Sequence, residues 1–233
     1  MRGRTHAGFT LVELLIALVA MSLLAVLAWR GLDGMTRAQA YTEARADDVL
    51  TLQTGLAQWA ADLEAMEQLR GMKAIEWNGR VLRLTRRSTA NATDGVLVVG
   101  WARRSVPAGT LWMRWQSQPV TTRGDIEQAW QRADLWAQNQ GGGGDAREVA
   151  IVPLEEWQVF YFRDNAWTNP QSSDITSSIV ATARPAASAA SGAVTVNTAP
   201  IPDGVRIVLS LPPGSAISGL VTRDWVAPQV TPQ

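Results

Sequence analysis

The sequence lacks cysteine altogether and has a single histidine, His6, close to the N-terminus. The missing cysteines exclude disulfide bonds, a cysteine lipid anchor, thiolate metal sites and a cysteine nucleophile. Without a histidine, the rest of the chain cannot form a Ser-His-Asp triad or a histidine-based zinc site. We therefore predict no catalytic residues, no metal site, no cofactor and no enzymatic activity.

An excess of charge of either sign is also missing. The chain has 21 basic and 21 acidic residues and a formal net charge of +0. No basic face is evident, so nucleic acid is not an expected partner. Adjacent carboxylates occur twice, as Asp47 with Asp48 and Glu155 with Glu156. Because adjacent side chains point in different directions on helices and strands, we interpret both pairs as solvated surface charge.

A long apolar run extends from Phe9 to Trp29, directly after the polar N-terminal residues. It is long enough to cross a bilayer as a helix, and Glu13 is its only ionisable residue. Arg2 and Arg4 predict a cytoplasmic N-terminus, which places the rest of the chain across the membrane. A carboxylate inside a membrane span is costly, and such residues usually have a partner and a function.

Two other interpretations of this run compete. It can be a plain signal anchor that tolerates Glu13. It can also be a secretory signal peptide, because Val26-Leu27-Ala28 fits the small-x-small pattern before a cleavage site. The charge of Glu13 and the length of the run both count against the signal peptide, whose apolar region usually has about 7–15 residues.

Gly8, followed by Phe9 and four residues later by Glu13, resembles the N-terminus of type IV pilins and type II secretion pseudopilins. In that family a prepilin peptidase cuts after the glycine and methylates the amine of the new N-terminal phenylalanine. The resemblance implies a cleaved leader peptide of residues 1–8, a cut between Gly8 and Phe9, and an N-methylphenylalanine at Phe9. The leader would take His6 with it.

The role of Glu13 follows from the charges that this cut would leave. The free amine of Phe9 would be basic near pH 7. Amine and carboxylate lie on one rigid helix and cannot pair within a subunit, but helices packed with an axial stagger can pair them between subunits. We therefore expect Glu13 to be an assembly residue that fixes the register between neighbouring subunits.

From Ala38 to Leu69 the chain has no proline, and large apolar residues recur at alternating steps of three and four. This spacing predicts an amphipathic helix that continues the membrane helix. The apolar stripe consists of Val49, Leu52, Leu56, Trp59, Leu63 and Met66. The stripe is short for a coiled coil, which favours packing on a sheet. Asp62 falls off the stripe, so we expect it to face water.

Beyond Gly71 the pattern changes to that of strands. Asn78-Gly79 between two β-rich segments predicts a hairpin. Further elements are expected as strands at 95–101, 111–115, 149–152, 157–162, 202–211 and 217–225, with a short helix at 125–138. Residues 171–200 are rich in Ser, Ala and Thr and have few large apolar groups, which predicts a mobile surface insertion.

The expected architecture is α+β, with a long N-terminal helix packed on antiparallel β-sheets, as in pilins. Its expected parts are a leader (1–8), a transmembrane helix (9–30), a periplasmic continuation of the helix (31–70) and a β-rich periplasmic domain (71–233).

Segments outside the N-terminus resemble the J-type minor pseudopilins of type II secretion. They are Trp29-Arg30-Gly31-Leu32, Trp157 to Trp167, Pro202 to Leu209 and Gly219 to Trp225. The resemblance implies a single-pass inner-membrane protein at the tip of a periplasmic pseudopilus, in a complex that primes assembly and supports export of folded proteins. The implied partners are the I-type and K-type minor pseudopilins, with the H-type and the major pseudopilin as further candidates, and the prepilin peptidase as processing enzyme.

Alternatives remain open at this point. A minor pilin of a type IV pilus or DNA-uptake machine would share the same N-terminus, whereas a membrane-anchored periplasmic enzyme lacks a nucleophile and base, and a binding module would need a deep tryptophan-lined pocket. Within the leading interpretation we predict a partner interface at Leu52, Leu56, Trp112 and Trp115, because tryptophan is enriched at binding hot spots.

Overall fold

The structure, a computed structural model, describes residues 10–88, 95–139, 147–171 and 200–228. The predicted leader, with Gly8 and its neighbour Phe9, lies outside the described residues. So does all of the predicted insertion except Gln171 and Pro200.

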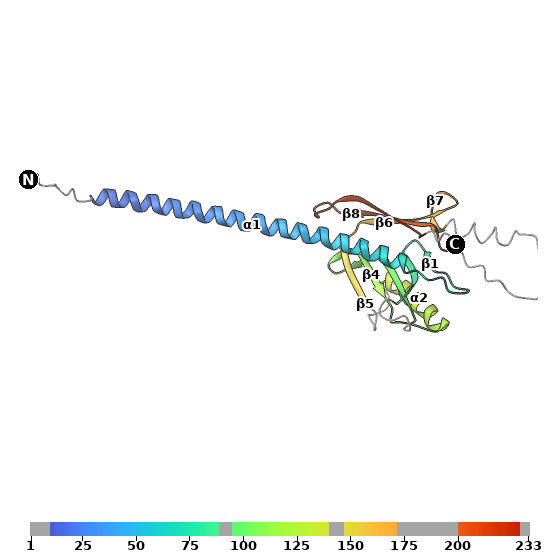
Figure 1. The fold of residues 1–233 in the computed structure, drawn as a ribbon. Helices are drawn as coiled ribbons and strands as arrows, with labels where there is room; N and C mark the ends of the chain where they lie inside the picture. The colour runs from blue at the N-terminus through green and yellow to red at the C-terminus, as the bar shows by residue number, and fades with distance from the viewer. Residues whose placement is uncertain (1–9, 89–94, 140–146, 172–199, 229–233) are drawn as a thin grey trace, which may run out of the picture. The chain divides into compact units, whose positions relative to one another are not determined.

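A long N-terminal helix is followed by antiparallel strands, which confirms the predicted α+β fold (Figure 1). The helices are α1 (Leu11–Glu64) and α2 (Arg123–Ala137). The strands are β1 (Ile75–Trp77), β2 (Val81–Arg87), β3 (Val96–Val106), β4 (Gly109–Gln116), β5 (Arg147–Pro153), β6 (Glu156–Arg163), β7 (Ala166–Thr168), β8 (Gly204–Leu211) and β9 (Gly219–Val226).

The chain separates into two compact units, and the boundary falls inside α1 between Asp47 and Asp48. In the first unit every described side chain, from Thr10 to Asp47, is exposed. The second unit contains the last turns of α1, α2 and all of the strands.

Two antiparallel sheets build the second unit. The five-stranded sheet has the order β1-β2-β3-β4-β5, and the four-stranded sheet has the order β7-β6-β8-β9. The predicted hairpin at Asn78-Gly79 is confirmed, with Trp77 opposite Leu82 in the register of β1 and β2. Gly79 takes a φ of 88°, which a residue with a side chain rarely adopts.

The last turns of α1 lie between the two sheets. One apolar core joins Leu52, Trp59 and Leu63 of α1 to one face of each sheet. A second core fills the space between α2 and the opposite face of the five-stranded sheet. The layers of this unit are therefore α2, the five-stranded sheet, the end of α1 and the four-stranded sheet, and Figure 1 shows β6 and β8 across α1 from β4 and β5.

The helix α1 ends at Glu64, so the prediction of helix as far as residue 70 was wrong in its last turn and a half. Beyond Glu64 the backbone pairs with β2 instead, because β1 covers only the first half of that strand. Glu67 N donates to Thr85 O at 3.0 Å, and Met66 forms a bridge to Arg86. Unpaired strand groups must find partners when buried, and this requirement overrides the helical preference of the sequence.

Candidate functional site

The N-terminal part of α1 carries the residue that the sequence singles out, Glu13, in its first turn. Glu13 N donates to Thr10 Oγ1 at 3.4 Å, and Thr10 Oγ1 donates to Glu13 Oε2 at 3.4 Å. A carboxylate in the first turn is favoured by the helix dipole, and the threonine hydroxyl satisfies one of the free amides there. Glu13 is thus held at the beginning of the helix and has no described partner outside its own turn.

The surface around Glu13 is apolar and exposed over a long stretch. Leu11 is 76% exposed and Trp29 is 74% exposed, and the large apolar residues between them are also exposed. Among the described residues, α1 is the helix that is long and apolar enough to cross a membrane. None of its apolar part is buried against the protein. By length and composition, this segment suits a lipid environment or contact with other helices.

The predicted partner interface at Leu52, Leu56, Trp112 and Trp115 needs correction. Leu52 is 3% exposed, Trp112 is 0% exposed and Trp115 is 4% exposed, so all three belong to the cores. Leu56 is partly buried and packs against the same core as Leu52. Trp112 stacks on Trp101 with 4.6 Å between ring centroids. Leu52, Leu56 and Trp112 pack in the core between the two sheets, where the sequence predicted that the helix stripe packs on one sheet. Trp115 packs against α2 in the second core.

Asp62 is a buried charged residue whose position the sequence did not predict. It is 0% exposed rather than facing water. Its Oδ1 accepts hydrogen bonds from Arg86 Nη1 at 2.5 Å and Arg114 Nη2 at 2.8 Å. Its Oδ2 accepts from Arg114 Nε at 2.7 Å and Trp101 Nε1 at 2.9 Å. Gln58 Nε2 adds a bond to Oδ1 at 3.0 Å, so both oxygens are fully used.

We call Asp62, Arg86 and Arg114 the buried charge cluster. The three residues come from α1, β2 and β4, and Trp101 of β3 completes the contact across three adjacent strands. A buried carboxylate is tolerated only when paired and hydrogen-bonded, a condition that this cluster meets. The cluster therefore binds the end of α1 to the centre of the five-stranded sheet.

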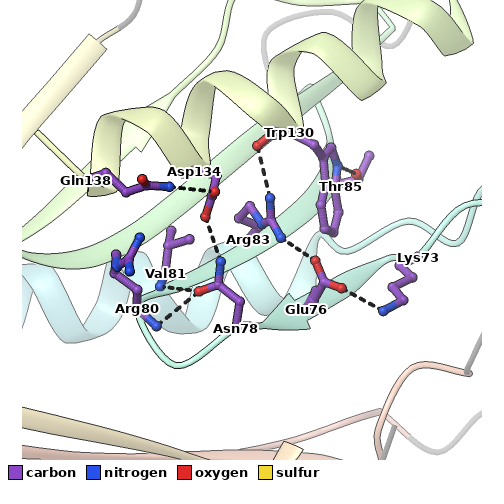
Figure 2. Close-up of polar contacts among 10 residues, drawn as sticks. All are labelled: Lys73, Glu76, Asn78, Arg80, Val81, Arg83, Thr85, Trp130, Asp134 and Gln138. Carbon is purple, nitrogen blue, oxygen red and sulfur yellow. Dashed lines mark hydrogen bonds and ion pairs between the residues drawn. The ribbon is translucent and has the colours of Figure 1, made fainter. Parts of the chain in front are cut away.

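A second polar network holds α2 on the hairpin of β1 and β2 (Figure 2). Asn78 Nδ2 donates to Asp134 Oδ1 at 2.6 Å. Trp130 Nε1 donates to Thr85 Oγ1 at 2.9 Å, and the Arg83 guanidinium lies 5.2 Å from the centroid of the Trp130 ring. Trp130 is partly buried, and these contacts hold its ring against β2.

Catalytic or metal-binding groupings do not emerge from these contacts. In the ranges that the structure describes, no group of three or more His, Cys, Asp or Glu side chains lies close enough to hold a metal ion. The carboxylate of Asp62 is ion-paired with two arginines, and that of Asp134 accepts hydrogen bonds from the side-chain amides of Asn78 and Gln138.

Comparison with known proteins identifies the N-terminus. The chain carries a prokaryotic N-terminal methylation motif, matched over residues 3–29. Gly8, Phe9 and Glu13 all lie inside the matched residues, while the cleavage point and the role of Glu13 remain predictions. The match covers about a tenth of the chain, so the motif describes the N-terminus and not the β-rich unit.

No relative among curated proteins matches this chain. Among solved structures, a chain of the crystal structure of the GspK-GspI-GspJ complex from the enterotoxigenic Escherichia coli type 2 secretion system is similar at 14% sequence identity, with a TM-score of 0.44. The match covers 78% of this chain and 99% of that chain.

Proposed function

We propose that this protein is a minor pseudopilin of J type in a type II secretion system. The observation that carries the proposal is the N-terminal methylation motif at residues 3–29, together with an apolar run from Phe9 to Trp29 in which Glu13 is the only ionisable residue. In this proposal the leader is removed after Gly8, Phe9 is methylated, and the helix anchors the protein in the inner membrane with the β-rich unit in the periplasm. The protein then serves assembly and has no enzymatic role.

The J-type assignment has its support in the β-rich unit. The segments from Pro202 and from Gly219 that resemble the J-type proteins form β8 and β9, the last two strands of the four-stranded sheet. On this basis we propose the I-type and K-type minor pseudopilins as partners in a tip complex. The H-type and the major pseudopilin are the next candidates.

Glu13 gives the proposal a physical mechanism. Its carboxylate is exposed and without a described partner outside its own turn, on a helix that needs lipid or other helices around it. In an assembly, the methylated amine of Phe9 on one subunit would meet Glu13 of its staggered neighbour. Truncating one member of a buried charge pair leaves the other uncompensated, so assembly becomes sensitive to this one residue.

The processing step is tested by mass analysis of the mature N-terminus after co-expression with a prepilin peptidase. The expected product begins with N-methylated Phe9. Gly8→Leu should stop cleavage, whereas Gly3→Leu, also in the leader but away from the cut, should leave it intact. A native product that begins at any other residue removes the basis of the proposal.

The assembly step is tested with Glu13→Ala and the uncharged, similarly sized Glu13→Gln. Both variants should be cleaved and membrane-bound but recovered in sheared filaments at less than about a tenth of the wild-type amount. Ser22→Ala, on the same exposed helix, is the matched control and should assemble normally. Normal incorporation of Glu13→Ala would show that the charge pair is unnecessary.

Co-purification in detergent separates secretion from pilus machines. The full-length protein should bind co-expressed I-type and K-type minor pseudopilins. Binding to minor pilins of a type IV pilus or DNA-uptake machine, with none to the pseudopilins, would favour that alternative.

A further inference from the structure

The free edge of β9 differs from the other sheet edges that the structure describes. Proteins usually protect edge strands by shortness, proline, bulges or charge, because unpaired backbone groups invite other chains to pair. β1 and β7 are three residues long, and β5 ends at Pro153 beside a register shift in its pairing with β4. β9 has eight residues and pairs with β8 in an unbroken register from Val226 to Gly219. β9 is therefore not protected by shortness, proline or a bulge.

The unpaired groups of β9 can be assigned from its pairing. Ala227 N donates to Asp203 O at 2.8 Å, which fixes the phase of the ladder between β8 and β9. Because amides in an antiparallel strand alternate in direction, the N–H groups of Leu220, Thr222, Asp224 and Val226 point away from β8. In the part of the chain that the structure describes, no strand pairs with this side of β9, so the four residues present a row of unpaired backbone donors and acceptors.

Side chains along the same edge are apolar at both ends. Leu220 is 75% exposed and Val226 is 67% exposed, and both belong to the outer face of the sheet. Between them Asp224 is already paired with Arg206, whose Nε and Nη2 donate to it at 2.7 and 2.6 Å. Arg223 lies on the other face of the strand and is exposed, so its guanidinium can contact a strand that pairs with this edge.

Arg223 also argues against a second copy of this chain as the occupant. Two β9 strands paired antiparallel over residues 220–226 would place Arg223 directly opposite Arg223. The pairing over residues 219–225 would place Val221 opposite Arg223 and Leu220 opposite Asp224. Neither register gives Arg223 a carboxylate, so self-pairing is disfavoured while an acidic strand from another protein is favoured.

We propose that the edge of β9 is a docking site for an extended segment of a different protein, which adds a strand to the four-stranded sheet. The segment carries an acidic residue opposite Arg223 and apolar residues near Leu220 and Val226. Backbone hydrogen bonds supply the affinity, and these three side chains select the sequence. The site lies outside the N-terminal helix and does not depend on the proposed function.

The probe is a fluorescein-labelled octapeptide of alternating Val and Thr with one Glu opposite Arg223, and a matched peptide carries Lys there. Binding to the full-length protein in detergent is followed by fluorescence anisotropy. The Glu peptide should bind about three- to thirtyfold more tightly than the Lys peptide, as expected for an opposite-charge rather than a like-charge cross-strand pair. Arg223→Glu should reverse this preference.

Thr222→Pro tests the backbone edge itself. It removes an N–H that points away from β8, so the fold should persist, as checked by circular dichroism. Binding of the Glu peptide should be lost in Thr222→Pro and stay within about threefold of wild type in the control Thr222→Ala. Equal binding by both variants, or no binding by the wild type, overturns the proposal. Self-association of the wild type that Thr222→Pro abolishes also overturns it and assigns the edge to a second copy.

Discussion

Replacing Asp62 by Asn should destabilise the β-rich unit more than any other single loss of charge in the described residues. The substitution keeps the size of the side chain and removes the charge that Arg86 and Arg114 share. Arg86 is 6% exposed and Arg114 is 9% exposed, so neither guanidinium can recover the loss by turning to water. The new amide would also bring N–H donors against guanidinium donors.

The expected cost follows from buried ion pairs in general. Removing one partner of a buried pair costs about 3–5 kcal/mol, because the remaining charge stays desolvated. For a unit of this size, each kcal/mol lowers the melting temperature by roughly 2–4 °C, so a fall of about 6–20 °C is expected. Unfolding is followed by tryptophan fluorescence of the full-length protein in detergent, in which Trp101 and its stacked neighbour Trp112 report on the cluster directly.

Glu64→Gln is the matched control, since Glu64 is an exposed carboxylate two residues away on the same helix. Its effect should stay within about 0.5 kcal/mol. The variant with Asp62→Leu, Arg86→Leu and Arg114→Met should regain much of the stability lost in Asp62→Asn, because apolar residues can replace a buried ion cluster. If Asp62→Asn melts within about 2 °C of Glu64→Gln, the cluster does not stabilise the fold as argued.

Two further predictions concern other contacts of the same unit. Gly55→Ala should destabilise the fold by about 1–3 kcal/mol despite the better helix propensity of alanine, because the new Cβ would lie 2.5 Å from Ile151 Cγ2. The control Gly124→Ala, with open space around the new Cβ, should be neutral or stabilising in the same melting assay. The guanidinium of Arg206 holds the pKa of Asp224 below its usual value of 3.8, so the unfolded state binds more protons near that pH. Melting measured between pH 2 and 6 should therefore show a small contribution to stability that is lost as the pH falls below about 4. Asp224→Asn should abolish this part of the pH dependence, and an unchanged profile would contradict the prediction.

The sequence predicted the elements of the fold well where hydrophobic period and turn chemistry agree. The hairpin at Asn78-Gly79 and strands such as β6 and β8 lie within about two residues of their expected positions. The start of α2 was expected at Asp125 and is at Arg123, where Thr122 caps the helix by accepting from Asp125 N at 3.2 Å. Local signals suffice to find such elements, because an alternating apolar pattern, a tight turn and a helix cap all lie within the segment itself.

The predictions that failed depend on contacts between distant parts of the chain. A single apolar stripe on α1 led to the expectation that Asp62 faces water, and the enrichment of tryptophan at binding hot spots led to the expectation that Trp112 contacts a partner. Two sheets enclose this helix, so residues beside the stripe are buried as well. The signal that existed was the pair Arg86 and Arg114 in otherwise buried strands, since unpaired arginines there require a carboxylate from elsewhere.

Gly55 and Asp62 show why a hydrophobic pattern misses part of the contact between α1 and the five-stranded sheet. They are seven residues apart, two helical turns, and therefore lie on the same side of the helix. Both face the five-stranded sheet, Gly55 against Ile151 and Trp112 and Asp62 within the buried charge cluster. The glycine lets the backbone approach the sheet, and the carboxylate then fixes the position along it. Neither residue counts as apolar, so the helix position is set by two residues that a search for core positions discards.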